Sequence, residues 1–214
     1  MAVAQPSIEI DQRTLGEVRE LLVGMEKMVP RVIRRAIKRT TSQLRTKMIK
    51  VGAKAFGIKQ KTIRERVWRN VARTAFIGKV RAGKIGWPLS AFSPRKTRKG
   101  ITIKIFGRRQ VAEGAFMATM PTGHEGVFVR KGRQSLPIVE ARAKSLTLML
   151  EEEGLTPLLV TFARRVFNAE LLDAADWYAD RAAKRDPQLA YRREQASASR
   201  SGFNTYGTPR ASAE

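Results

Sequence analysis

The chain has 214 residues, of which 43% are hydrophobic and 29% charged, a balance typical of a folded soluble protein with a sizeable core. It contains no Cys and one His, which excludes disulfide scaffolds, thiol catalysis and zinc sites built on several Cys or His residues. With 42 Lys and Arg against 19 Asp and Glu, the formal net charge of +23 favours a polyanionic or acidic partner.

The positive charge is concentrated in the middle of the chain. Residues 31–109 contain 25 Lys and Arg and one acid, Glu65, whereas the rest of the chain has a net charge of −1. Like charges at this density repel one another, which favours a negatively charged partner over a merely solvated face. No apolar run approaches the roughly 20 residues that span a bilayer, and the first residues lack the pattern of a signal peptide. We therefore expect no membrane partner and synthesis in the cytoplasm.

The first two helices are predicted from apolar residues at helical spacing. Thr14 and Glu17 have the spacing of a capping box, which predicts that a helix begins there. Pro30 separates this helix from a second one over residues 31–51, which Gly52 ends. Basic residues cover most of the second helix outside its apolar stripe. The stripe consists of Ile33, Ile37, Leu44, Met48 and Val51.

A third, short basic helix is predicted over residues 59–69. Together with the helix before it, this segment invites comparison with a helix-turn-helix, although its turn residues are not distinctive.

The pattern then changes to strands over residues 74–82, 101–106, 115–120 and 127–130, with an edge strand over 136–139 that contains Pro137. An apolar cluster spans residues 87–92, and residues 93–100 form a basic loop. The residues predicted to lie in the core of this region are Phe116, Val127, Phe128, Leu136 and Ile138.

Helices return near the end of the chain. One is predicted over residues 143–152, and Gly154 breaks it. Thr156 caps a longer helix, with Pro157 in its first turn, that runs to about residue 184. Its predicted packing stripe is Leu155, Leu159, Phe162, Val166, Ala169 and Leu172.

The order of elements predicts an α+β fold with N-terminal helices, a small antiparallel sheet and a long C-terminal helix. We expect one domain over residues 1–186. Residues 187–214 are rich in Ser, Ala, Arg and Gly. We expect them to form a flexible tail, or one that a partner orders.

The residue inventory offers little for catalysis. His124 stands beside Glu125, but no nucleophile signature accompanies it, and the second His of an HExxH metal motif is absent. The glycines form neither a Walker A loop nor a dinucleotide-binding fingerprint. The run Glu151–Glu153 fits an acidic helix end better than a cation site. We therefore expect no enzyme activity, no cofactor and no metal. Trp68, Trp87 and Trp177 have rings able to stack on bases, but core or interface anchoring is favoured.

Seven basic residues are the candidate sites of electrostatic contact with DNA or an acidic partner. The first choice is Arg95, Lys96, Arg98 and Lys99, and the second choice is Arg34, Arg35 and Lys38. Three function classes are weighed: a structural subunit of a large assembly, a sequence-independent nucleic-acid binder and an enzyme. Composition alone favours the nucleic-acid binder, whose contacts with phosphates weaken as salt rises.

An ordered series of short motifs changes that ranking. The series is Trp87-Pro-Leu-Ser-x-Phe, Thr97-x-x-Gly-Ile, Gly114-Ala-Phe-x-Ala-x-Met, Gly123-His-x-Gly-Val-Phe-x-Arg, Gly132-Arg and Leu136-Pro-Ile. Ala36-Ile37-x-Arg39-Thr40 and Lys59-x-Lys61-Thr62-Ile63 precede it. In this order and spacing the chain resembles the prophage minor tail protein Z family of long-tailed phages over about residues 8–165.

The resemblance implies a non-enzymatic virion protein of the tail–neck junction that completes the tail and enables it to join the head. It implies a ring of identical subunits, a hexamer first, in contact with tail terminator, tail tube or neck proteins. Contact with the end of the packaged DNA remains open. The expected location is the virion, after assembly in the host cytoplasm. The alternative is a free DNA-binding protein that acts through the basic central block.

Overall fold

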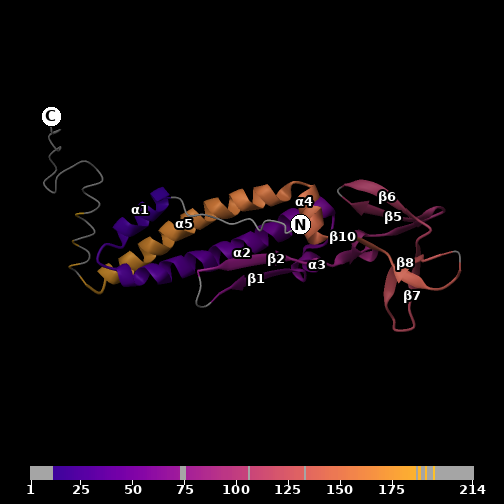
Figure 1. Cartoon of the computed structure of the whole chain (residues 1–214), viewed down its shortest axis with the longest axis horizontal. Helices are drawn as coiled ribbons and strands as arrows, with labels where there is room; N and C mark the ends of the chain where they lie inside the picture. Colours follow the sequence, from indigo (N-terminus) through magenta and orange to yellow (C-terminus); the bar gives the residue numbers. More distant parts are fainter. Residues whose placement is uncertain are drawn as a thin grey trace, which may run out of the picture. The chain divides into compact units, whose positions relative to one another are not determined.

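The chain folds as an α+β protein, as the sequence predicts (Figure 1). The computed structural model describes residues 12–72, 76–105, 107–132 and 134–186, together with Gln188, Tyr191 and Gln195. The rest of the predicted tail over residues 187–214 lies outside the described residues. No helix in the described ranges is both long and apolar enough to cross a membrane.

The chain divides into two compact units. Met1–Gln43, Val71–Gly78 and Val160–Glu214 form the first, here called the helical unit. Leu44–Asn70 and Lys79–Leu159 form the second, here called the sheet unit. Helices α2 (Val29–Phe56) and α5 (Leu155–Ala183) contribute to both units. The single domain expected over residues 1–186 therefore stays a prediction.

In the helical unit, α1 (Gln12–Leu21), the first part of α2 and most of α5 pack around one apolar cluster. The short 3₁₀ helix η1 (Glu26–Met28) connects α1 to α2. Pro30 lies in the first turn of α2, where its missing N–H costs no hydrogen bond. Small residues on α2 and α5 let these helices approach closely. The buried members are Val18, Leu22, Val32, Ala36, Ile37, Phe167, Leu171, Ala174 and Ala175.

Three expectations for these helices are wrong in detail. Thr14 lies inside α1 and is buried, so it does not cap the helix. On α2 the buried face includes Val32 and Ala36, whereas the predicted Ile33 is only partly buried. The buried face of α5 is likewise offset from the predicted stripe and consists of Leu159, Ala163, Phe167, Leu171, Ala174, Ala175 and Ala179. Apolar residues are spread around α5, so their period alone does not select the side of this helix that meets the core.

The described residues contain ten short strands, which pair antiparallel. They form the hairpin β1–β2, the pair β3–β10 and two three-stranded sheets, β4–β5–β6 and β7–β8–β9. The strands are β1 (Val67–Val71), β2 (Gly78–Ala82), β3 (Gly86–Pro88), β4 (Arg95–Thr97), β5 (Gly100–Ile105), β6 (Arg108–Glu113), β7 (Phe116–Thr119), β8 (Glu125–Arg130), β9 (Ile138–Glu140) and β10 (Arg142–Ser145).

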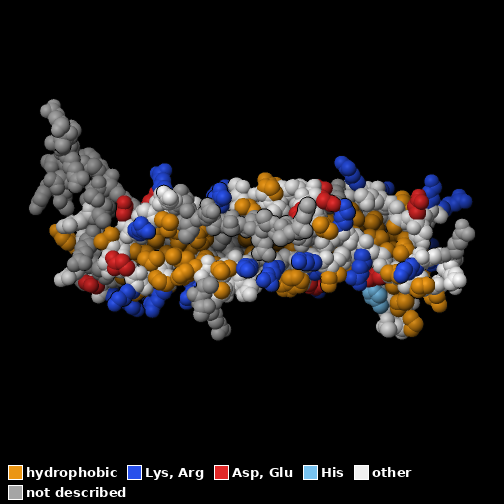
Figure 2. All heavy atoms as spheres, viewed as in Figure 1, with side chains coloured by type: hydrophobic (Ala, Val, Ile, Leu, Met, Phe, Trp, Pro, Cys, Tyr) orange, Lys and Arg blue, Asp and Glu red, His pale blue; other side chains and the backbone are white. Residues whose placement is uncertain are grey.

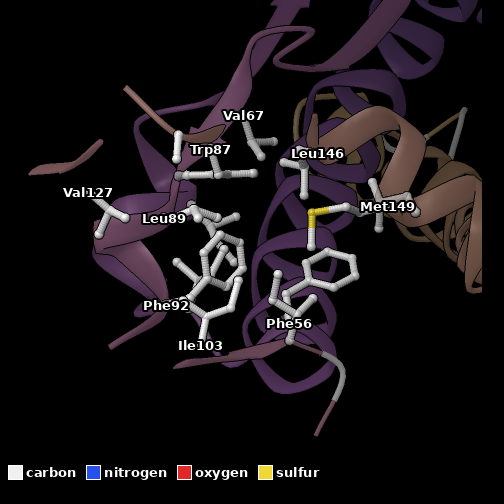
Figure 3. Close-up of a cluster of buried hydrophobic side chains, with 14 of the residues drawn as sticks. Phe56, Val67, Trp87, Leu89, Phe92, Ile103, Val127, Leu146 and Met149 are labelled. Carbon is white, nitrogen blue, oxygen red and sulfur yellow. The ribbon is translucent and has the colours of Figure 1, made fainter. Parts of the chain in front are cut away.

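The core of the sheet unit is drawn in Figure 3. Trp87 and Phe92, from β3 and the 3₁₀ helix η2 (Leu89–Phe92), are each 1% exposed. They belong to one cluster with Phe56 of α2 and Met149 of α4 (Leu146–Glu152). The predicted strand over residues 101–106 is confirmed through residue 105. Its alternate residues Ile101, Ile103 and Ile105 are all buried, because successive side chains of a strand point to opposite faces.

The predicted end of the second helix and the third helix are wrong. Helix α2 continues through Gly52 to Phe56, and Gly57 with a φ of +69° follows it. Gly52 is buried, and a Cβ there would lie 3.4 Å from the ring of Phe56. The third helix, α3, covers only Gln60–Arg64, because the residues from Val67 onward form β1.

Other differences concern strands. The basic loop over residues 93–100 contains β4, the strand β6 was not predicted, and residues 142–145 form β10 before α4 begins. The side chain of Ser145 caps α4 by accepting a hydrogen bond from the N–H of Leu148 at 3.4 Å. The strand expected over residues 74–82 covers Gly78–Ala82, and residues 73–75 lie outside the described residues. The predicted edge strand over residues 136–139 is confirmed as β9, although β9 covers Ile138–Glu140 and so begins after Pro137.

The predicted core of this region is confirmed in part. Val127 and Phe128 are buried, whereas Phe116 and Ile138 are only partly buried. Leu136 is wrong, since it is 66% exposed. It precedes β9, outside the paired strands that would cover it.

Two glycines mark close backbone approaches. A Cβ on Gly78 would lie 2.5 Å from Cγ2 of Thr41 and 2.6 Å from Cγ2 of Ile37, both on α2. A Cβ on Gly86 would collide with the carbonyl oxygen of Ala143 on the paired strand β10. At both positions any larger residue would displace its neighbours.

Candidate electrostatic interface

The four first-choice basic residues lie on one hairpin of the sheet unit. Strands β4 and β5 pair with Thr97 opposite Gly100, which leaves Arg98 and Lys99 as a two-residue turn. The hydroxyl of Thr97 donates to the carbonyl oxygen of Gly100 at 2.9 Å. Gly100 has a φ of +137°, a conformation that favours glycine. The geometry of this turn therefore places Arg98 and Lys99 at the tip of the hairpin, between β4, which carries Arg95, and β5, whose alternate residues are buried.

The strand register places further cations on the outer face of the sheet β4–β5–β6. Directly opposite residues share a face, and Ile101, Ile103 and Ile105 point into the core, so Lys104 points outward. Lys104 is opposite Arg109 of β6. In the adjacent row, Thr102 of β5 is opposite Arg95 of β4 and Val111 of β6. We call Arg95, Arg98, Lys99, Lys104 and Arg109 the cationic sheet face.

These cations are exposed and have no acidic partner among the described residues. Lys96 is opposite Ile101 and so belongs to the other face of the hairpin, but it is exposed and unpaired in the same part of the chain. One acid, Glu113, lies on the same outer face, at the end of the sheet opposite Gly100. Unpaired cations of one sign at this density create a positive potential that attracts polyanions.

The second-choice residues lie on α2, in the helical unit. Arg34 and Lys38 are exposed, but Arg35 is partly buried. The guanidinium carbon of Arg35 lies 4.1 Å from the ring centre of Trp177 on α5, a cation–π contact within the unit. Arg35 is thus engaged internally, whereas Arg34 and Lys38 make no ion pair with a described residue.

An internal ion-pair cluster beside them was not predicted. Arg39 of α2 donates to Glu170 at 3.0 Å and also to Asp173, both on α5, and Gln43 donates to Glu170 at 2.6 Å. The hydrogen bond and charge of Glu170, assisted by Asp173, raise the pKa of Arg39. No local sequence signal links residues more than 125 positions apart.

Two exposed acids, Asp173 and Glu152, have basic partners in the same chain. Asp173 pairs with Arg39 in the helical unit, and Glu152 pairs with Lys144 in the sheet unit. Because pairing neutralises part of the acidic charge locally, these positions offer less negative charge to another subunit than the sequence suggests.

His124 is held in a small polar cluster of the sheet β7–β8–β9. Its Nε2 lies 3.1 Å from Oε1 of Glu140, and Arg142 donates to the other carboxylate oxygen at 2.8 Å. Partial burial acts to raise the pKa of Glu140, but the hydrogen bonds from His124 and Arg142, with their charge, outweigh it and lower the pKa. The ring of His124 also meets Phe128 edge to face, with ring centres 6.3 Å apart. This cluster joins the turn before β8 to β9.

A groove of about 390 Å³ lies behind the cationic sheet face. Its apolar lining comes from the sheet-unit core, and its polar lining includes the ion pair of Lys144 with Glu152. His124 does not line it. Within the described residues no group of three or more His, Asp or Glu side chains is placed to hold a metal ion. The lining residues are Leu89, Ile103, Ile105, Gln110, Arg142, Ala143, Lys144, Met149 and Glu152.

The three tryptophans have different surroundings. Trp87 is buried, with the guanidinium carbon of Arg66 4.4 Å from its ring centre. Trp177 contacts Arg35 and meets Tyr178 edge to face at 4.8 Å. Trp68 is 54% exposed. Trp87 and Trp177 therefore anchor packing contacts within their own units.

No family model, curated protein or solved structure matches the chain.

Proposed function

We propose that the protein is a non-enzymatic structural component of a phage virion, acting at the tail–neck junction to complete the tail and enable head–tail joining. The observation that carries the proposal is the ordered motif series and its resemblance to the prophage minor tail protein Z family. We further propose that the subunits form a ring, with a hexamer as the first expectation.

The positions of the motif residues support a structural role. Trp87-Pro-Leu-Ser-x-Phe forms β3 and η2, and it buries Trp87, Leu89 and Phe92 in the core of the sheet unit. Gly123-His-x-Gly-Val-Phe-x-Arg covers the end of the turn before β8 and the whole of that strand. Residues that shape turns and fill the core maintain the fold on which a functional site is carried.

In this proposal the cationic sheet face supplies the electrostatic contact. Arg98 and Lys99 extend at the tip of a hairpin, so they reach beyond the body of the sheet. Exposed, unpaired cations bind a polyanion without first breaking an ion pair. The partner is either the end of the packaged DNA or an acidic surface of a terminator, tube or neck protein.

A second candidate is a sequence-independent DNA-binding protein that acts outside the particle. The cationic sheet face favours it as well, because contacts between cations and phosphates need no sequence readout. The two candidates differ in location: a virion component remains in purified particles, whereas the alternative acts without them.

Disruption of the gene in a phage-producing lysogen tests the proposal. Electron microscopy of the lysate should show full heads apart from unjoined or defective tails, and expression of the intact gene from a plasmid should restore joined particles. Normal infectious particles from the disrupted lysogen would refute the assembly role. A plasmid copy with Arg95, Lys96, Arg98 and Lys99 changed to Gln then asks whether the hairpin charge is needed for joining.

A further inference from the structure

Trp68 is a large aromatic side chain that the fold leaves about half exposed. It is 54% exposed, and it makes no hydrogen bond, ring contact or cation contact with any described residue. In contrast, Trp87 is 1% exposed, and Trp177, which is 38% exposed, makes ring contacts with Arg35, Arg181 and Tyr178. Trp, with an apolar ring and a polar N–H, is enriched at interfaces.

The register of the hairpin β1–β2 is fixed by a hydrogen bond at each end. The N–H of Gly83 donates to the carbonyl of Arg66 at 2.9 Å, and the N–H of Ala72 donates to the carbonyl of Ile77 at 2.9 Å. A Cβ on Gly83 would lie 3.4 Å from the Cβ of Arg66, which places the two positions on the same face of the hairpin.

This register places Trp68 opposite Arg81 and Asn70 opposite Lys79, all on one face of the hairpin. The other face carries Val67, which is buried, and Val80 and Ala82, which pack against the core of the sheet unit. Alternate residues of a strand point to opposite faces, so the side chains on the face of Trp68 and Arg81 point away from the core. We call Trp68, Asn70, Lys79 and Arg81 the tryptophan face.

The tryptophan face carries positive charge without compensation. Lys79 and Arg81 are exposed, and neither forms an ion pair within the described part of the chain. Strands β1 and β2 contain no acidic residue. Over the region where Figure 1 draws β1, β2 and α3, Figure 2 shows Lys and Arg side chains next to hydrophobic ones.

We propose that the tryptophan face binds single-stranded DNA, with the indole of Trp68 stacked on a base and with Lys79 and Arg81 contacting the adjacent phosphates. Every base offers a π-face, and aromatic rings flanked by cations are the usual means of binding a single strand without reading its sequence. In a duplex the base faces are already stacked on one another, so Trp68 would add nothing. An acidic protein surface would engage the two cations but leave the indole without a partner.

This inference does not rest on the assembly role, because it concerns the purified protein and its binding of DNA. The test measures fluorescence anisotropy of labelled 20-nucleotide oligo-dT and of a labelled 20-base-pair duplex at 50, 100 and 200 mM salt. The variants are Trp68→Ala, Trp68→Phe and the double variant Lys79→Gln, Arg81→Gln. Met117→Ala is the matched control, since Met117 is 52% exposed on β7.

We expect Trp68→Ala to weaken binding of oligo-dT by roughly 5- to 150-fold, the usual range for one base–aromatic stack. Duplex binding should change by less than about twofold, and Trp68→Phe should keep most of the affinity for oligo-dT. The double variant should weaken binding of both DNAs and lower the salt slope for oligo-dT by up to about 1.4, since each phosphate contact contributes about 0.7 on a single strand. Met117→Ala should bind like the wild type.

Three results would overturn the proposal: no binding of oligo-dT by the wild type, equal binding by the wild type and Trp68→Ala, or equal losses for oligo-dT and duplex. If Trp68→Ala does not melt cooperatively, the proposal is tested instead by the intrinsic fluorescence of the wild type and of Trp68→Phe. Oligo-dT should quench the tryptophan emission of the wild type more strongly than that of Trp68→Phe, because a base stacked on an indole quenches it. Equal quenching of the two proteins would also overturn the proposal.

Discussion

Removing the charge of the β4–β5 hairpin should reduce DNA binding without destabilising the fold. The change is the quadruple variant Arg95→Gln, Lys96→Gln, Arg98→Gln and Lys99→Gln. All four side chains are exposed, and none makes an ion pair with a described residue. Surface substitutions of this kind usually change the free energy of unfolding by less than about 0.5 kcal/mol each. A loss of binding can therefore be attributed to the charges themselves.

The magnitude follows from counterion release. Each phosphate contact on duplex DNA contributes about 0.9 to the slope of log affinity against log salt. If all four cations contact phosphates, the slope of the variant is smaller in magnitude by about 3.6. Between 50 and 200 mM salt, the wild type should then lose roughly 150-fold more affinity than the variant loses.

The assay is duplex binding by anisotropy over that range of salt, accompanied by thermal melting of each protein. The control removes four positive charges outside the central basic block, so that both proteins have the same formal net charge. It consists of Arg164→Gln, Arg165→Gln, Lys184→Gln and Arg185→Gln, at positions that are all exposed. The hairpin variant should melt within a few degrees of the wild type, and the control should keep the wild-type salt slope.

Equal salt slopes for the hairpin variant and the wild type would refute the reasoning, because the four cations would then contact no phosphate. Equal reductions in the hairpin variant and the control would also refute it. In that case the binding would depend on net charge alone, and the arrangement of the cationic sheet face would have no part in it.

Three further predictions concern stability. Leu171 is fully buried in the helical unit, so Leu171→Ala should lower the free energy of unfolding, measured by urea denaturation, by about 2–5 kcal/mol. The control Leu158→Ala, at a position that is 65% exposed, should change it by less than about 0.5 kcal/mol. Similar values for the two variants would contradict the assigned core. Gly78→Ala should cost about 1–3 kcal/mol in the same assay, because the new Cβ would lie about 2.5 Å from side-chain carbons of α2; an unchanged midpoint would show that the hairpin can move away. The pKa of Glu140 is lower in the folded protein, so its stabilising effect is full above its unfolded pKa of about 4.3 and is lost as the pH falls through the folded value. Melting temperatures between pH 3 and 6 should therefore depend less on pH in Glu140→Gln than in the wild type or in the control Glu125→Gln, and parallel curves would show that Glu140 contributes nothing.

Local pattern was sufficient for the main elements. The alternation of Ile101, Ile103 and Ile105 predicts β5 and its buried face, because a strand has a period of two residues. Pro30 and Gly154 mark helix boundaries for local reasons, the first by its missing N–H and the second by a φ of +61°. The α+β class and the concentration of charge in the central block follow from the sequence alone.

Sequence patterns gave wrong predictions where the structure of a segment depends on residues far away along the chain. Residues 143–145 read as the start of a helix but belong to β10, because this strand pairs with β3 more than 50 residues earlier. Leu136 reads as a core residue but is exposed, since hydrophobicity does not reveal whether another element covers a side chain. Strand propensity is weak, and tertiary pairing overrides it.

The sequence by itself determined that the centre of the chain is a dense basic block, and it identified the hairpin cations Arg95, Lys96, Arg98 and Lys99 as the first candidates for contact. Only the tertiary structure decided which basic residues are already engaged, such as Arg35 on Trp177, and that Trp68 is left exposed beside Arg81. The physical reason is that charge and periodicity are properties of neighbouring residues. Partners and burial depend on contacts between segments far apart in the chain, which exist only once it has folded.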